Sequence, residues 1–208
     1  LETLNLSYNS LTTLDVSANT ALQYLYVNYN SLTAIDVSNN TGLIQFHVID
    51  NSLTALDVTN NTSLTNFQFH FNNITTIDLS NNAVLDFLSG RDNSLTSLDV
   101  SNNPVLEKIW CGSNAITSID ISNNPLITVF QMGSNSLTSA NLQNGANTNL
   151  TQLYLTGNPN LECIRVDDVA YSTTNWTNIG SNTSFTEGTY CRYTSVPDAN
   201  FLTTTGWN

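Results

Sequence analysis

The sequence repeats with a period of 21 residues over most of its 208 residues. One threonine and one aspartate recur at this spacing, at Thr12, Thr33, Thr54, Thr75, Thr96, Thr117 and Thr138, and at Asp15, Asp36, Asp57, Asp78, Asp99 and Asp120. A fixed period of this length indicates structural units that stack along one axis, each too small to bury its own apolar edge. The chain must therefore adopt a repeat architecture.

Each unit divides into an A half and a B half. The A half reads L-x-x-L-x-V-x-x-N, as in Leu22–Asn30, and the B half reads L-T-x-L-D-V-S-x-N, as in Leu32–Asn40. L-x-x-L-x-L-x-x-N is the leucine-rich repeat signature, and its L-x-V part has the periodicity of a β-strand. A halves begin at Leu1, Leu22, Leu43, Leu64, Leu85, Leu106, Ile127 and Leu150, and B halves at Leu11, Leu32, Leu53, Ile74, Leu95, Ile116, Leu137 and Leu161. We therefore expect an all-β solenoid of about eight 21-residue coils, with short strands on both faces and a C-terminal cap.

An asparagine closes nearly every half-repeat. The A column comprises Asn9, Asn30, Asn51, Asn72, Asn93, Asn114 and Asn135, and the B column Asn19, Asn40, Asn61, Asn82, Asn103 and Asn124. A buried amide is costly unless it is hydrogen-bonded, and stacked coils supply partners at regular intervals. We interpret both columns as structural ladders.

The pattern loosens after Leu137, which predicts three segments. Residues 1–160 form the solenoid, residues 161–192 a C-terminal cap, and residues 193–208 a linker or the start of a following domain. Asp167 or Asp168 is suited to N-cap a short helical turn in the cap. Because the first A half has no cap, we expect a monomeric fragment of a larger protein.

The three cysteines fall into two groups. Cys111 occupies an inward slot of the repeat and is expected to be a buried apolar residue. Cys163 and Cys191 lie outside the core slots, and we expect them to form a disulfide, as in a protein from an oxidising compartment; two free thiols are the alternative. No Cys/His spacing indicates zinc, so neither a metal site nor a cofactor is predicted.

The composition argues against two classes of function, nucleic-acid binding and membrane insertion. With 4 Lys+Arg against 16 Asp+Glu and a net charge of -12, the chain lacks the cations that nucleic-acid binding needs. No apolar run approaches the ~20 residues of a membrane helix, so membrane insertion is not expected.

The nested halves resemble a known repeat class. Their alternation at period 21 is similar to the leucine-rich repeats called IRREKO, abundant in secreted and cell-surface proteins of Bacteroidetes. The stretches 144–150, 158–163, 166–169 and 174–176 resemble the C-terminal cap of those proteins, and 193–201 resembles a segment that often precedes their repeat arrays. The resemblance implies a secreted or surface-displayed interaction module, and it supplies no catalytic residues.

The outward residues of the A halves vary between coils, whereas those of the B halves are nearly uniform. Exposed aromatic residues and arginine are typical of interfaces. The sequence therefore predicts a face that binds a protein or a glycan through Tyr24, Tyr26, Tyr29, His47, His70, Phe71, Phe87, Arg91, Lys108 and Trp110. The alternative is neutral variation on a tolerant sheet.

Two other functions stay open. The regular threonine column could form an ice- or surface-binding array. Asp86 and Glu107, equivalent residues of adjacent coils, could form the carboxylate pair of a glycoside-active enzyme. The B-half aspartates, which repel one another, are expected to bond to Ser and Thr hydroxyls of adjacent coils; Ca²⁺ binding is the alternative.

Overall fold

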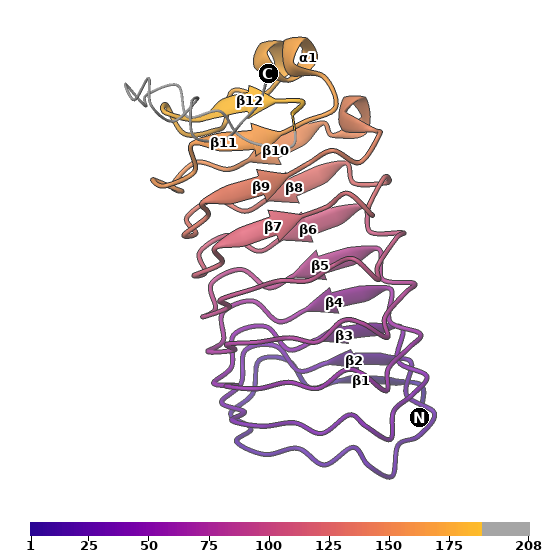
Figure 1. Ribbon diagram of the computed structural model, residues 1–208. Helices are drawn as coiled ribbons and strands as arrows, with labels where there is room; N and C mark the ends of the chain where they lie inside the picture. Colours follow the sequence, from indigo (N-terminus) through magenta and orange to yellow (C-terminus); the bar gives the residue numbers. More distant parts are fainter. Residues whose placement is uncertain (189–208) are drawn as a thin grey trace, which may run out of the picture.

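The computed structural model describes residues 1–188 and confirms the predicted solenoid. Figure 1 shows the coils stacked along one axis with little curvature, from the N-terminal coil to a helix-bearing cap. Eight coils carry an A strand, and the cap adds a ninth turn. Because strands of adjacent coils pair in parallel, each residue lies beside its equivalent one repeat away, as Leu25 lies beside Phe46.

The A halves form an eight-stranded parallel sheet with one strand per coil. In order along the sheet, the strands are β1 (Thr3–Asn5), β2 (Tyr24–Tyr26), β3 (Gln45–His47), β4 (Asn66–Gln68), β5 (Phe87–Ser89), β6 (Lys108–Trp110), β8 (Val129–Gln131) and β10 (Gln152–Tyr154). This sheet is the one on which the predicted binding residues lie.

The second sheet is shorter than expected. It contains only β7 (Ser118–Asp120), β9 (Ser139–Asn141), β11 (Cys163–Arg165) and β12 (Ser184–Thr186), so the first five B halves carry no strand. A turn bond from an aspartate to the N–H two residues later occurs in coils with and without a B strand, as from Ser38 N–H to Asp36 Oδ1 and from Ser122 N–H to Asp120 Oδ1, both at 2.8 Å. Backbone bonds between coils, such as Ser52 N–H to the Leu32 carbonyl at 2.9 Å, continue outside any strand.

The core lies between the two faces, and where one coil places a large side chain in it, the next coil can place a small one. The Phe46 and Phe67 rings stack at 5.8 Å, and Phe67 contacts Phe69 at 4.8 Å. Gly90 occupies the slot that follows Phe69 in the next coil, where a Cβ atom would lie 2.4 Å from the Phe69 ring. Cys111 fills the same slot one coil further on; it is buried and free as predicted, and burial raises its pKa to about 12.

Both predicted asparagine ladders are present, but they differ in their bonding. In the A column, Asn72 donates to the Val48 and Phe69 carbonyls at 2.9 and 3.0 Å and accepts from Leu53 N–H at 3.0 Å. In the B column, the side-chain amide nitrogens donate to two carbonyls, while five buried Oδ1 atoms have no partner among residues 1–188, at Asn40, Asn61, Asn82, Asn103 and Asn124. The A column therefore bonds the coils more completely.

The cap covers the last coil with non-repetitive structure. After the short 3-10 helix η1 (Asn147–Asn149) and β11, helix α1 (Val169–Asn175) packs beside β12. Asp168 is the N-cap, as predicted for Asp167 or Asp168, and its Oδ1 accepts from Tyr171 N–H at 2.9 Å. No helix in residues 1–188 is long and apolar enough to cross a membrane.

Two of the sequence predictions fall partly outside the described residues. Cys191 and the segment 193–208 lie outside residues 1–188. The Cys163–Cys191 disulfide and the segment boundaries at 161 and 193 therefore stay predictions.

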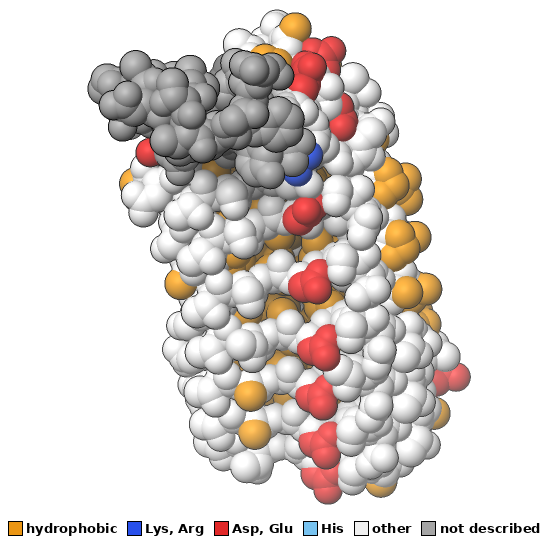
Figure 2. All heavy atoms as spheres, viewed as in Figure 1, with side chains coloured by type: hydrophobic (Ala, Val, Ile, Leu, Met, Phe, Trp, Pro, Cys, Tyr) orange, Lys and Arg blue, Asp and Glu red, His pale blue; other side chains and the backbone are white. Residues whose placement is uncertain are grey.

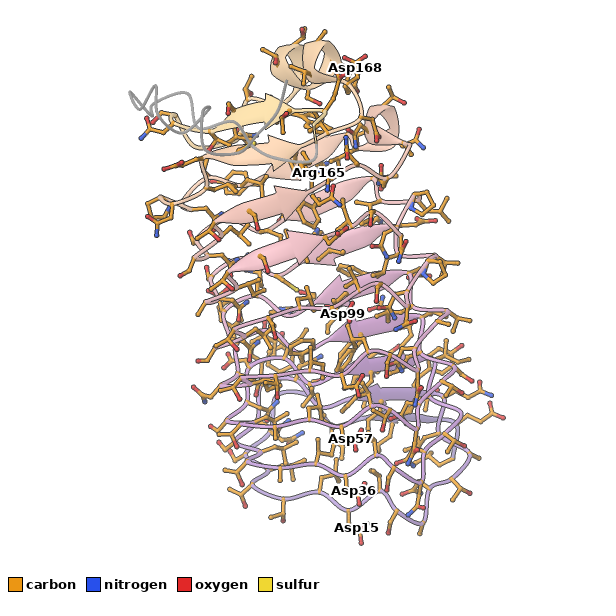
Figure 3. All side chains as sticks on the ribbon, in the orientation of Figure 1. Asp15, Asp36, Asp57, Asp99, Arg165 and Asp168 are labelled. Atoms are coloured by element: carbon orange, nitrogen blue, oxygen red, sulfur yellow. The ribbon has the colours of Figure 1, made fainter. Side chains whose placement is uncertain are left out.

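The B face, formed by the outward residues of the B halves, is uniform. Figure 2 shows its column of acidic side chains, and Figure 3 labels several of these aspartates. Their Ser and Thr partners differ from the expectation, because they come from the same coil: Asp57 Oδ1 accepts from the hydroxyl and the N–H of Thr59 at 2.6 and 2.9 Å. These two bonds lower the pKa of Asp57. Asp120 also accepts from Asn141 Nδ2 of the next coil at 3.0 Å. No group of three potential metal-ligating residues occurs in residues 1–188.

The aspartate column predicts a loss of stability in acid. The pKa of Asp57 is lowered from 3.8 in the folded chain, so its contribution to stability is complete above about pH 4 and disappears as the pH falls through the lowered value. Urea unfolding followed between pH 2 and pH 7 measures this dependence. Asp57→Asn keeps an acceptor for Thr59 but does not titrate, so its acid loss should be smaller than that of the unchanged chain. If repulsion within the column dominated instead, Asp57→Asn would steepen the acid loss.

Candidate ligand-binding face

The candidate site is the A face, formed by the outward side chains of the eight-stranded sheet and of the turn after each strand. From β2 onward the middle residue of each strand, such as Leu25 or Phe46, is buried, so its two neighbours point outward. The resulting columns are Thr3, Tyr24, Gln45, Asn66, Phe87, Lys108, Val129 and Gln152, and Asn5, Tyr26, His47, Gln68, Ser89, Trp110, Gln131 and Tyr154. Neighbours in a column are about 4.8 Å apart and can contact each other.

A polar network links coils two to four of the A face. Tyr26 Oη donates to Gln45 Oε1 at 2.8 Å, and its ring meets the His47 ring edge-on at 4.9 Å. His47 Nε2 lies 3.0 Å from Asn66 Oδ1, which also accepts from Gln68 Nε2 at 3.0 Å. These contacts hold the side chains of the A face in defined positions.

Both histidines of the A face are partly buried. Burial lowers the pKa of His47, opposed by its hydrogen bond with Asn66. Burial also lowers the pKa of His70, and the nearby Arg91 lowers it further. His70 Nδ1 lies 3.0 Å from the hydroxyl of Ser89. Both imidazoles are therefore neutral at neutral pH and serve as hydrogen-bonding groups.

An aromatic pair marks coils five and six. The Phe87 and Trp110 rings meet edge to face at 4.8 Å, a favourable arrangement for aromatic side chains. The Trp110 Nε1–H is buried and has no acceptor among residues 1–188. Lys108, beside Trp110 on the same strand, is exposed. The pair therefore places an aromatic surface next to a positive charge.

A column of left-handed residues runs along the edge of the A face. The φ angles lie between 51° and 59° at Tyr8, Tyr29, Asp50, Phe71, Asp92, Ser113 and Ser134, and Gly157 continues the column at 80°. Bulky residues seldom adopt this conformation, whereas Asp, Ser and Gly tolerate it better. The conformation was not predicted from the sequence, although Gly157 and the two aspartates in this slot were a signal for it.

The aromatic residues of this column are exposed and paired. The Tyr8 and Tyr29 rings stack at 4.5 Å, and Tyr8 is 77% exposed. The Arg91 guanidinium lies 5.8 Å from the centre of the Phe71 ring and bonds Asp92 at 2.9 Å. Tyr8 was not among the predicted binding residues, but the structure places it on the same surface.

The ten predicted residues all lie on the A face, but they do not converge on one point. They span coils two to six, about 19 Å along the stack. The structure brings together Tyr26 with His47, His70 with Phe71 and Arg91, and Phe87 with Trp110. This arrangement suits contact with an extended partner.

The carboxylates considered for catalysis are solvent-exposed. Asp86 and Glu107 occupy the same slot of adjacent coils. Burial and then the charge of Glu107 raise the pKa of Asp86, while Lys108 opposes the rise. Exposed carboxylates of this kind can accept hydrogen bonds, but they lack the water-excluding surroundings that tune an acid for glycoside cleavage.

The comparisons with known proteins agree with this architecture. The family model for the Leucine Rich Repeat matches residues 1–19. The functional domain of InlJ from Listeria monocytogenes is 28% identical, with a TM-score of 0.56, over 89% of this chain and 54% of that chain. The chain therefore shares the leucine-rich repeat fold of these proteins.

Two further solved structures share the fold. A leucine-rich repeat protein of Leptospira interrogans is 21% identical with a TM-score of 0.67, over 86% of this chain and 47% of that one. The internalin inlF of Listeria monocytogenes is 20% identical with a TM-score of 0.54, over 92% and 62%. The chain thus spans about half of the length of these structures. No curated protein matches it.

Because Phe71 lies in the left-handed column, we expect that its side chain does not raise the free energy of unfolding. Phe71→Asn places a residue that tolerates positive φ in this slot, so the free energy of unfolding should stay the same or rise by up to about 1 kcal/mol. Urea unfolding measures the change, with Ser113→Asn in the same column as the matched control. A loss above about 1 kcal/mol for Phe71→Asn would show that the ring stabilises the fold.

Proposed function

We propose that this chain is a non-enzymatic recognition module, secreted or displayed on a cell surface, that binds a protein or a glycan through the A face. The observation that carries the proposal is the contrast between the two faces of one repeat. The B face repeats Thr, Asp and Ser in coil after coil, while the A face carries aromatic, imidazole and cationic side chains that change from coil to coil.

Backbone strain supports the use of the A face. Tyr29 and Phe71 hold left-handed conformations that cost roughly 1 kcal/mol each, although serine fills the same slot in other coils. Both side chains are more than 40% exposed, so burial offsets little of this cost. Strained and exposed aromatic residues are better explained by recognition than by stability.

Preorganisation favours binding as well. Tyr26, His47 and Trp110 are already positioned by neighbouring side chains, so little rotamer entropy is lost when a ligand docks on them. Arg91 and Lys108 are positive charges on a chain of net charge -12. They should attract an anionic group on the partner.

The finer assignments rest on the resemblance of the repeat. The nested 21-residue halves and the cap sequence support a Bacteroidetes-type protein of this class. An oxidising compartment would be consistent with the predicted Cys163–Cys191 disulfide. Stacked coils give leucine-rich repeats an extended surface for partners, and the A face is the surface of that kind here.

The exposed threonine column of the B face favours the ice- or surface-binding array as a second candidate. Its seven threonines lie one per coil, and no aromatic residue interrupts them. Thermal hysteresis measured on the unchanged chain distinguishes this array from a recognition module, which should show none.

The proposal predicts which face controls affinity. A pulldown and a glycan array first identify the ligand. Trp110→Ala and Tyr26→Ala should then each weaken its binding by about 1–3 kcal/mol, because each removes an aromatic contact surface. Thr54→Ala on the B face is the matched control and should change the Kd little. Loss of affinity in Thr54→Ala, with both aromatic variants unaffected, would assign binding to the B face.

A further inference from the structure

The A face ends in a hollow where its last two strands meet the cap. The hollow has a volume of about 270 Å³ and lies between β8, β10 and the residues around the end of α1. Its lining includes Gln131, Gln152, Tyr154, Asn175, Trp176 and Asn178. None of its lining residues, all within the described part of the chain, carries a charge.

Free amide groups face this hollow. The side-chain amides of Gln131, Gln152 and Asn178 have no hydrogen-bond partner among residues 1–188. Each amide offers two donors and one acceptor group, and the Thr177 hydroxyl adds one more of each. The Thr151 hydroxyl donates to the Thr128 carbonyl at 3.0 Å and adds an acceptor. The hollow therefore presents several neutral donors and acceptors within a small volume.

An exposed aromatic ring forms one wall. The Tyr154 side chain is 49% exposed, and a Cβ atom on Gly133 would lie 2.7 Å from a carbon of its ring. The ring thus rests against the backbone at Gly133, and part of its surface stays open to solvent.

Trp176 makes a rigid apolar wall. It is 5% exposed, its Nε1–H donates to the Leu150 carbonyl at 3.4 Å, and its ring meets those of Tyr171 and Phe185 edge to face. The hollow is therefore preformed by the packing of the cap on the last coil.

We propose that this hollow binds one neutral sugar ring of a glycan. Sugar hydroxyls pair with the amide groups, and the C–H face of the ring packs on Tyr154. A wholly apolar ligand would leave the amides unpaired, and a charged one would find no counter-charge in the lining. The volume is just below the 300–1,000 Å³ or so of pockets for drug-sized molecules, as expected for a single ring. This site is separate from the aromatic residues of coils two to six and does not depend on them.

The experiment titrates the whole chain with methyl glycosides of glucose, galactose, mannose and N-acetylglucosamine, followed by the NMR signals of the side-chain amides. At least one glycoside should give saturable shifts of the Gln131 and Gln152 amides. Tyr154→Ala should weaken it roughly three- to tenfold, because the stacking surface is lost. Gly133→Ala, which displaces the same ring, should also weaken it.

Thr54→Ala, on the B face and outside both proposed sites, is the control and should leave glycoside affinity unchanged. Tyr26→Ala, at the position of coil two equivalent to Tyr154, tests the proposed function separately. If Tyr26→Ala still binds the ligand of the aromatic residues of coils two to six, that result contradicts the proposed function and leaves the sugar site untouched. The sugar site is overturned if none of the four glycosides gives saturable shifts. It is also overturned if a folded Tyr154→Ala binds as well as the unchanged chain, or if methyl glucuronide binds more tightly than every neutral glycoside.

Discussion

The bond between each inward asparagine and the coil before it is the interaction on which the rest of the structure depends. Asn72 joins its own coil to the preceding one through the carbonyl of Val48 and the N–H of Leu53. Because the same bonds recur in every coil, they fix the period and align the strands in register. The outward side chains of the A face take no part in these bonds and are free to vary.

The two halves of each coil differ in how they hydrogen-bond their buried asparagine side chain. In the A half, the amide satisfies both a carbonyl and an N–H, and a regular sheet follows. In the B half, Leu43 N–H bonds the Asn40 carbonyl, so no backbone N–H reaches the buried Oδ1 of Asn61. The B face carries instead side-chain turns, in which Asp accepts from the N–H two residues later. This asymmetry leaves the A face as the surface open to specialisation.

Periodic features of the chain could be predicted from the sequence. The coil count, the inward slots and the buried state of Cys111 follow from spacing alone, since one repeat reports on all the others. An N-cap at Asp167 or Asp168 was predicted from residue type and position, and the structure assigns it to Asp168. These features depend on local chemistry that recurs or on short-range geometry.

Other features were missed or are not encoded in the repeat. The left-handed column was missed because Tyr and Phe share its slot with the two aspartates and Gly157, whose tolerance of positive φ was the signal. The aspartate partners were assigned to adjacent coils, although a turn two residues long is the shorter path. The hollow beside Tyr154 depends on how the non-repetitive cap packs, which no repeat unit encodes.

The most direct measurement compares the free energy of unfolding of Asn72→Ala and Asn61→Ala. Asn72→Ala removes the one partner that Leu53 N–H has within residues 1–188, so it should cost about 2–4 kcal/mol. Asn61→Ala leaves the Val37 and Asn40 carbonyls bonded to backbone N–H groups and should cost about 1 kcal/mol. A loss for Asn61→Ala equal to or greater than that for Asn72→Ala would contradict the central role of the A column.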